Sequence, residues 1–95
     1  MGVLNELINE INKVLSDKSK VFVTKDNIVI NMNREYLRSH AKINKLLNNL
    51  NILFKGYRIA FIDKKFCVIN NINSELEECY TCLNKALNYV LNKEE

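Results

Sequence analysis

The spacing of apolar residues changes in a regular order along the chain, and this order predicts helices that alternate with β-hairpins. Apolar residues in residues 3–16 recur every three or four positions, which places them on one face of a helix. Two runs of β-branched and aromatic residues follow, at residues 21–24 and 28–32. We expect a hairpin that turns at Asp26-Asn27, because Asp and Asn tolerate the positive φ of a tight turn.

The same order then occurs a second time. Asn33 is placed to cap a second helix, which we expect to run to about Phe54. Two further strand-like runs, residues 58–62 and 66–69, flank a charged tripeptide and predict a second hairpin. Ser74 begins a capping box, with a carboxylate three residues later, so we expect a third helix from there to about residue 92.

An internal repeat relates the two halves of this order. When the chain is shifted by 39 positions, residues 4–38 lie over residues 43–77 without a gap. Six identical pairs are Leu7 and Leu46, Phe22 and Phe61, Lys25 and Lys64, Val29 and Val68, Ile30 and Ile69, and Leu37 and Leu76. Residues 1–95 are therefore expected to form a single α+β domain of order α-ββ-α-ββ-α, a duplicated α-ββ unit with a C-terminal helix. Its simplest assembly is a four-stranded antiparallel sheet with packed helices.

Alternation along the strands divides their residues between two faces of the predicted sheet. We expect helices to cover the face that carries Val21, Val23, Ile28, Ile30, Met32, Ala60, Ile62, Cys67 and Ile69. The opposite face is too apolar for an open sheet face, which suggests an interaction site. Its candidate protein-binding residues are Phe22, Ile59, Phe61, Phe66 and Val68. The alternative is that a helix crosses this face and makes it core.

Composition limits the class of protein further. The 95 residues are 47% hydrophobic and 26% charged, which is ordinary for a globular domain. The apolar runs fall short of the roughly 18 residues that a membrane span needs, and the first residues do not resemble a signal peptide. We therefore expect a cytoplasmic, intracellular protein without a membrane partner. Three cysteines are an odd number, so a disulfide framework is not expected.

Positive charge is concentrated in the middle of the chain. Residues 18–65 hold eleven Lys and Arg against three Asp and Glu, although the whole chain carries only +3. Such a concentration is typical of phosphate binding. The candidate nucleic-acid-binding residues are Lys25, Arg34, Arg38, Lys42, Lys45, Arg58, Lys64 and Lys65, of which four form a stripe along the second helix. The alternative is a solvated helix face that keeps the protein soluble.

Residues with reactive side chains do not assemble into a catalytic set. Cys79 and Cys82 have C-x-x-C spacing, but the predicted helix places Cys79 in its second turn beside two glutamates, so we interpret both as packing residues. Together with Cys67 and His40 they could in principle provide four zinc ligands. Structural zinc sites usually take their ligands from short loops with two ligands each, whereas Cys67 and His40 would each contribute a single ligand. We therefore predict no catalytic, metal or cofactor site and no small-molecule substrate.

These patterns together favour a small accessory or adaptor protein that is not an enzyme. It is expected to bind a protein partner or a second copy of itself through an apolar face, within nucleic-acid-associated machinery. The alternative is direct binding of DNA or RNA through the basic helix stripe and the basic hairpin tips. The two hypotheses differ in salt dependence, because phosphate contacts weaken steeply as salt rises.

Overall fold

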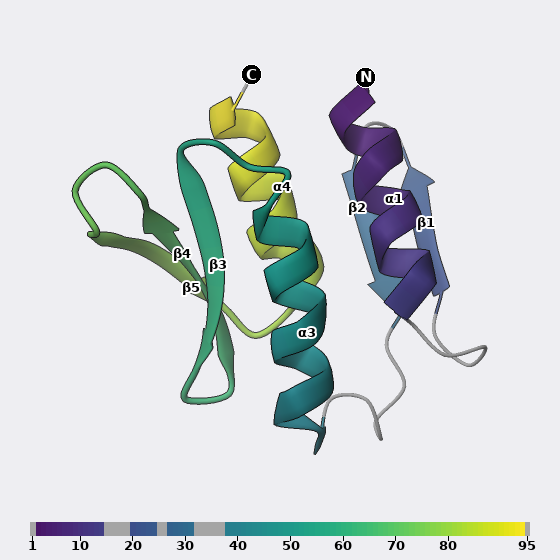
Figure 1. Cartoon of the computed structure of the whole chain (residues 1–95), viewed down its shortest axis with the longest axis horizontal. Helices are drawn as coiled ribbons and strands as arrows, with labels where there is room; N and C mark the ends of the chain where they lie inside the picture. The colour runs from purple at the N-terminus through teal and green to yellow at the C-terminus, as the bar shows by residue number, and fades with distance from the viewer. Residues whose placement is uncertain (1, 15–19, 25–26, 32–37, 95) are drawn as a thin grey trace. The chain divides into compact units, whose positions relative to one another are not determined.

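The computed structural model describes residues 2–14, 20–24, 27–31 and 38–94, which form two compact units, residues 1–53 and residues 54–95. The elements in chain order are α1 (Gly2–Val14), β1 (Lys20–Thr24), β2 (Asn27–Asn31), α3 (His40–Asn51), β3 (Tyr57–Ile62), β4 (Lys65–Asn70), β5 (Leu76–Tyr80) and α4 (Leu83–Glu94) (Figure 1).

The described residues of the first unit form two helices and one hairpin. β1 and β2 pair in antiparallel register, with Phe22 opposite Val29 and Thr24 opposite Asn27. α1 packs against α3 and against β1. The fully buried side chains of this unit recur at helical spacing on both helices and include one strand residue: Leu7, Ile11, Ile28, Ile43, Leu46 and Leu50.

The start of α3 differs from the sequence prediction. Ser39, in an extended conformation, accepts a hydrogen bond of 3.4 Å on its hydroxyl from the backbone N–H of Lys42, as an N-cap residue does. Arg38 therefore lies before the cap and not on the same helix as Lys42 and Lys45. Asn33, the predicted cap, lies outside the described residues.

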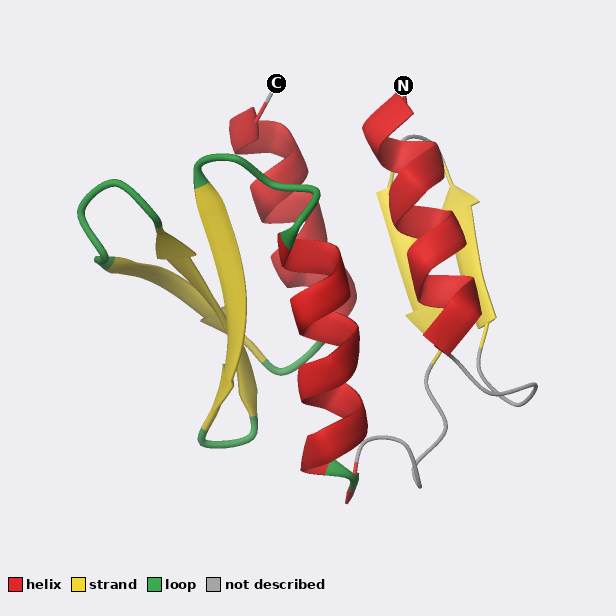
Figure 2. Ribbon diagram, viewed as in Figure 1, coloured by secondary structure: helices red, strands yellow, loops and turns green. Residues whose placement is uncertain are grey.

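The second unit is a three-stranded antiparallel sheet packed on one helix. β4 lies between β3 and β5, and α4 contacts all three strands (Figure 2). β3 and β4 are joined by a two-residue turn in which Asp63 and Lys64 both have positive φ, 50° and 64°. Both residues in the left-handed region give the backbone twist that tight hairpins favour. The turn ends at Lys65, which pairs with Ile62.

The predicted four-stranded sheet is wrong, although the chain is α+β. β1 and β2 form a two-stranded sheet, and β3, β4 and β5 form a second sheet. A strand has two hydrogen-bonding edges, and both edges of β4 are occupied, one by β3 and one by β5. The sequence prediction had placed the residues of β5 in a helix.

The predicted start of the third helix at Ser74 is also wrong. Ser74 has φ 59°, in the left-handed region, whereas an N-cap residue is extended. Residues 76–80 form β5, and the helix begins only at Leu83. Pairing with β4 overrides the local helical pattern, since tertiary context commonly outweighs propensity.

The covered face of the second hairpin is the reverse of the one expected from the repeat. Phe66 pairs with Tyr80, whose ring lies 6.3 Å from that of Tyr89 on α4, so this face of the sheet is directed toward the helix. Alternation places Val68 on the same face, and Val68 is fully buried. Its repeat equivalent in the first unit, Val29, is 41% exposed.

The physical reason for the reversal is that helices from different places in the chain cover the two hairpins. In the first unit α1, which precedes the hairpin, contacts β1, whereas in the second unit α4, which follows the hairpin, contacts β3, β4 and β5. α4 buries Leu83, Ala86, Leu87 and Val90, an apolar stripe at helical spacing. The face of the second sheet that receives this stripe becomes the core of the unit.

The described part of the chain contains no helix with the length and apolar character that crossing a bilayer requires.

Candidate protein-binding surface

The loop between β4 and β5 is held in place by the side chains of its own asparagines. Asn70 Oδ1 accepts a 2.8 Å hydrogen bond from the backbone N–H of Ile72. Asn73 Oδ1 accepts a 2.9 Å bond from the backbone N–H of Glu75. Both are bonds from a backbone N–H two residues ahead, the pattern by which Asn forms a local turn. The asparagine side chains therefore provide hydrogen-bond acceptors for the backbone N–H groups of Ile72 and Glu75 within the loop.

Backbone hydrogen bonds close the same loop. The N–H of Ser74 donates to the carbonyl of Asn70 at 2.8 Å, and the N–H of Asn70 donates to the carbonyl of Glu75 at 2.9 Å. Ser74, which closes the loop, has a backbone in the left-handed region of φ. This region is unfavourable for residues other than glycine, and such a residue usually keeps this conformation only where its surroundings fix it.

Two further contacts tie the loop to the start of β3. The backbone N–H of Asn71 donates to the carbonyl of Gly56 at 2.9 Å. The guanidinium of Arg58 donates to Asn71 Oδ1 at 2.8 Å. The loop is therefore fixed at its base and along one side, which limits the conformational entropy that it would lose on binding.

Two apolar side chains stand out from this fixed loop. Ile72, at its tip, is 90% exposed, and Leu76, which opens β5, is 54% exposed. Leu76 pairs with the half-buried Ile69 on β4. We call Ile72 and Leu76 the loop pair. An ordered loop whose polar side chains face its own backbone and whose apolar side chains face solvent is suited to docking on an apolar partner.

Glu77 connects β5 to α4. β5 has an irregularity opposite Val68 and Ile69, and Glu77 falls in this bulge. The Tyr89 hydroxyl donates a 2.6 Å hydrogen bond to Glu77 Oε1, and the Asn70 amide donates a 3.0 Å bond to Oε2. Both carboxylate oxygens are therefore engaged, instead of stabilising a helix N-terminus as the sequence had suggested.

These bonds shift the titration of both partners. The hydrogen bond from Tyr89, and then that from Asn70, lowers the pKa of Glu77, because both favour its charged form. The hydrogen bond to Glu77, with some burial, raises the pKa of Tyr89 to about 12. Burial, with the charge of Glu78, also raises the pKa of Tyr80.

The five residues predicted from sequence to bind protein lie in different places. Ile59, Phe66 and Val68 have at most 1% of their surface exposed and belong to the core of the second unit. Phe61 is half-buried, and its ring lies 4.9 Å from that of Phe66. The side chain of Phe22 lies outside the described residues. The structure therefore groups four of the five on the face toward α4, whereas Ile72 and Leu76 of the loop pair are among the large apolar side chains that are exposed.

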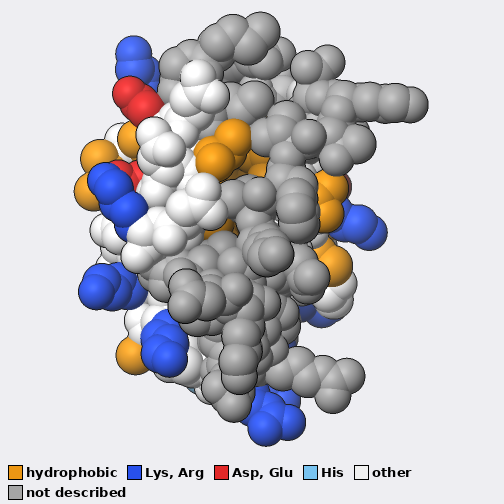
Figure 3. All heavy atoms as spheres, turned by 90° about the vertical axis from the view of Figure 1, so that its right-hand side faces the viewer, with side chains coloured by type: hydrophobic (Ala, Val, Ile, Leu, Met, Phe, Trp, Pro, Cys, Tyr) orange, Lys and Arg blue, Asp and Glu red, His pale blue; other side chains and the backbone are white. Residues whose placement is uncertain are grey.

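The predicted basic residues are dispersed over several elements. Lys42 and Lys45 are exposed on α3, Lys64 and Lys65 are exposed at the β3–β4 turn, and Arg38 is exposed before α3. The visible Lys and Arg side chains stand at the surface in the space-filling view (Figure 3). Arg58 is half-buried and bonded to the β4–β5 loop, so its role is at least partly structural. The side chains of Lys25 and Arg34 lie outside the described residues.

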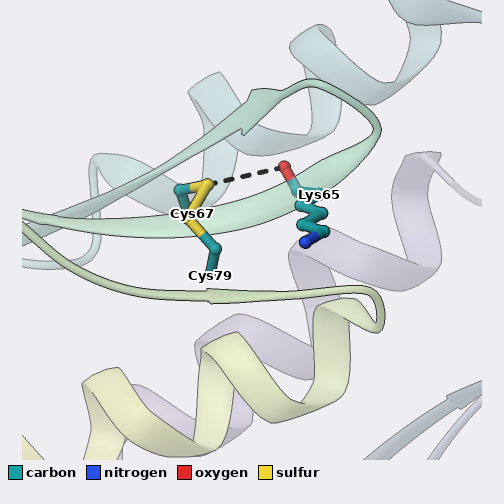
Figure 4. Close-up of a disulfide and its surroundings, with 3 residues drawn as sticks. All are labelled: Lys65, Cys67 and Cys79. Atoms are coloured by element: carbon teal, nitrogen blue, oxygen red, sulfur yellow. Dashed lines mark hydrogen bonds between the residues drawn. A yellow bond between two sulfur atoms is a disulfide. The ribbon is translucent and has the colours of Figure 1, made fainter.

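The cysteines also differ from expectation. Cys67 on β4 and Cys79 on β5 form a disulfide (Figure 4). Cys82 is an exposed free thiol. The expectation that the chain has no disulfide is therefore wrong. It rested on the odd number of cysteines, whereas the pairing of β4 and β5 brings Cys67 and Cys79 opposite each other and leaves Cys82 as the free thiol. His40 is exposed at the first residue of α3. Among the described residues, no cluster of three or more His, Cys, Asp and Glu could hold a metal ion.

Sequence reasoning missed the asparagines that build the loop. The segment Asn70-Asn71-Ile72-Asn73-Ser74 joins four turn-forming residues in a short stretch between two apolar runs. Such clusters mark loops. That signal was present, but the general abundance of Asn and the capping box at Ser74 obscured it.

No protein-family model matches this chain, and no curated protein or solved structure shows significant similarity to it, so the candidate surface rests on its own geometry.

Proposed function

We propose that the protein is a small non-enzymatic binding module, an accessory or adaptor protein that docks a protein partner through the loop pair, Ile72 and Leu76. The observation that carries the proposal is the 90% exposure of Ile72 on a loop that is held by backbone and side-chain hydrogen bonds of residues 70–75. Isolated exposed apolar residues need no explanation on a surface. An exposed isoleucine on a loop built to hold it is better explained as an anchor.

Physical chemistry supports this role for the loop. Burying apolar surface contributes roughly 25 cal/mol per Å², and a rigid loop loses little entropy on docking. The half-buried Ile69, paired with Leu76, extends the apolar surface onto β4. Arg58 and Asn71 border it with polar groups, an arrangement common at the rim of interfaces.

An intracellular location belongs to the same proposal. Cys82 is an exposed free thiol three residues from a disulfide-bonded cysteine. In an oxidising compartment such a thiol is prone to exchange or to join another chain. A reducing compartment keeps the Cys82 thiol free, and a disulfide such as Cys67–Cys79, which is rare in such compartments as a structural bond, would act there in thiol exchange.

The proposal is tested by capture from an extract of the cells that make the protein. Immobilised wild type is compared with Ile72→Asn and with Ile52→Asn, a matched control because Ile52 is 81% exposed at the C-cap of α3. The proposal predicts a partner protein that Ile72→Asn loses and Ile52→Asn retains. Equal capture by all three proteins would refute it.

Direct nucleic-acid binding is the second candidate, and it is supported by the exposure of Lys42, Lys45, Lys64 and Lys65. It predicts binding to a mixed pool of short DNA and RNA that falls by orders of magnitude between about 50 mM and 500 mM salt. Docking through Ile72 predicts a complex that survives the same change, since apolar contacts are not screened.

A further inference from the structure

The three cysteines of the chain all belong to the second unit, between residues 67 and 82. Cys67 and Cys79 are directly opposite each other on β4 and β5, with their Cα atoms 4.0 Å apart. Cys82 follows Cys79 by three residues and lies in the bend before Leu83, the first residue of α4. A free thiol and a disulfide therefore share a C-x-x-C segment between a strand and a helix.

The three sulfur-bearing residues differ in their access to solvent. Cys67 is only 2% exposed, Cys79 is half-buried and Cys82 is exposed. Thiol–disulfide exchange requires that the attacking thiol reach one sulfur of the disulfide. Of the two cysteines in the disulfide, Cys79 is therefore the residue that is more exposed to solvent, and Cys67 is the buried one.

We propose that Cys67, Cys79 and Cys82 form a thiol–disulfide exchange site. The thiolate of Cys82 attacks Sγ of Cys79, a Cys79–Cys82 disulfide forms, and the Cys67–Cys79 bond breaks. Cys67 leaves as a thiolate and takes up a proton in place of the one that Cys82 gave up. One disulfide and one thiol are present before and after the step, so it consumes neither an oxidant nor a reductant.

The spacing of Cys79 and Cys82 supports this exchange. Two intervening residues, Tyr80 and Thr81, separate them, and this is the spacing found in dithiol–disulfide motifs. Residues 81 and 82 form a bend, where the chain changes from strand to helix. A bend between the two cysteines lets their side chains approach each other, which continuous strand would not allow because alternate residues point to opposite faces.

The surroundings of Cys67 are suited to its thiol form. Its Sγ lies 3.9 Å from the carbonyl oxygen of Lys65, as the dashed line shows (Figure 4). A disulfide sulfur carries no hydrogen, so this contact becomes a true S–H hydrogen bond only when Cys67 is released. A buried thiol with an acceptor in place costs less than one without a partner.

The exchange would change which segment is covalently linked to β5. The Cys67–Cys79 disulfide joins β5 to β4, the middle strand, whereas the Cys79–Cys82 disulfide would join β5 to the segment that precedes α4. β5 is an edge strand, so without the first bond it is held to the sheet by the hydrogen bonds of a single neighbour. Small thiols and disulfides such as glutathione are the external reactants that would reach Cys82 and Cys79.

Disulfide mapping tests the proposal on the folded full-length chain. The protein is incubated in buffers of reduced and oxidised glutathione and quenched with acid. Free thiols are alkylated, and the chain is then cut after Lys and Glu. Cleavage after Glu75, Glu77 and Glu78 separates Cys67 from the other two cysteines, so the two disulfides give different peptides. We expect wild type to yield a bridged Cys79–Cys82 peptide together with alkylated Cys67, and Cys82→Ser to lose that peptide completely.

A second variant tests the geometry alone. Cys67→Ser leaves only Cys79 and Cys82, which we expect to form their mutual disulfide in oxidised glutathione. The proposal is overturned if wild type never yields the bridged Cys79–Cys82 peptide and is alkylated at Cys82 alone. It is equally overturned if Cys67→Ser carries glutathione on both cysteines and no bridge between them.

Discussion

Tyr89 on α4 and Glu77 in the bulge of β5 are joined by a 2.6 Å hydrogen bond from the phenol to the carboxylate. This bond connects the helix to the strand that opens with Leu76, and Asn70 binds the other oxygen of the same carboxylate. One glutamate therefore links the helix, the edge strand and the β4–β5 loop.

This pair predicts a specific dependence of stability on pH. The folded pKa of Glu77 is lowered, so its contribution is complete above its ordinary pKa of about 4.3 and is lost as pH falls further. The folded pKa of Tyr89 is raised to about 12, so its contribution to stability is complete below its ordinary pKa of about 10 and is lost as pH rises toward 12.

The variant Tyr89→Phe tests this dependence, because it removes the hydrogen bond to Glu77 at every pH. Urea midpoints of wild type and variant should therefore differ most near neutral pH, and the difference should shrink as pH falls below the ordinary pKa of Glu77 and as pH rises toward 12. A constant difference across this range would contradict the assignment.

The two hairpins bury opposite faces, so the same substitution at equivalent positions should change the unfolding free energy by different amounts. Val29 and Val68 are equivalent in the repeat, and both lie on strands, yet only Val68 is fully buried. Replacing either by Thr keeps the branched shape and exchanges one methyl group for a hydroxyl. Val68→Thr should cost about 1–3 kcal/mol for an unpaired buried hydroxyl. Val29→Thr should change the unfolding free energy by about 0.5 kcal/mol or less. Equal costs in urea unfolding would show that the two faces are not reversed.

The β3–β4 turn predicts a stabilising substitution. Lys64 has φ 64°, a region where a Cβ atom is unfavourable and glycine is not. Lys64→Gly should raise the unfolding free energy by about 0.5–1 kcal/mol in urea titration. Lys85→Gly is the matched control in α4, where it should lower the free energy by about 1 kcal/mol. A loss of stability for both variants would contradict the turn geometry.

The disulfide predicts sensitivity to reductant. Cys67 and Cys79 are separated by 12 positions, and closing a loop of that size stabilises the folded state by about 3 kcal/mol in the chain-entropy model. In the Cys82→Ser background, which excludes exchange, adding a dithiol reductant should lower the urea midpoint by a corresponding amount. The same chain with Cys67 and Cys79 also replaced by Ser should not respond. A reductant effect that persists in this triple variant would show that it does not arise from the disulfide.

Local patterns were sufficient to predict several elements of the fold. The helical spacing of residues 3–16 corresponds to α1, and the β-branched runs correspond to β1 to β4. The paired faces of each hairpin also follow the expected alternation. In the first hairpin Thr24 pairs with Asn27, which the sequence prediction had placed in the turn. The pairing is thereby shifted by two residues, and an even shift leaves each residue on its predicted face. These features depend on nearby residues, so a single sequence contains the information.

The remaining features depend on contacts distant in sequence. Leu76, Cys79 and Tyr80 have helical spacing, and only pairing with β4 makes their segment a strand. Once Cys79 was placed on a helix, its position opposite Cys67 could not be foreseen. Which face of the second sheet is buried likewise depends on α4, and the repeat says nothing about it. The loop pair was therefore hidden from sequence reasoning by the incorrect third helix.

The most direct test of the central claim is site-specific photocrosslinking in the cells that make the protein. A photoreactive residue replaces Ile72 in one variant and the exposed Lys85 of α4 in a control. Docking through Ile72 predicts a discrete protein adduct from position 72, either with a partner or with a second copy. The adduct should be absent from position 85 and lost when Leu76→Asp is added to the Ile72 variant. The same adducts from both positions, or none from position 72, would contradict the claim that this loop binds protein.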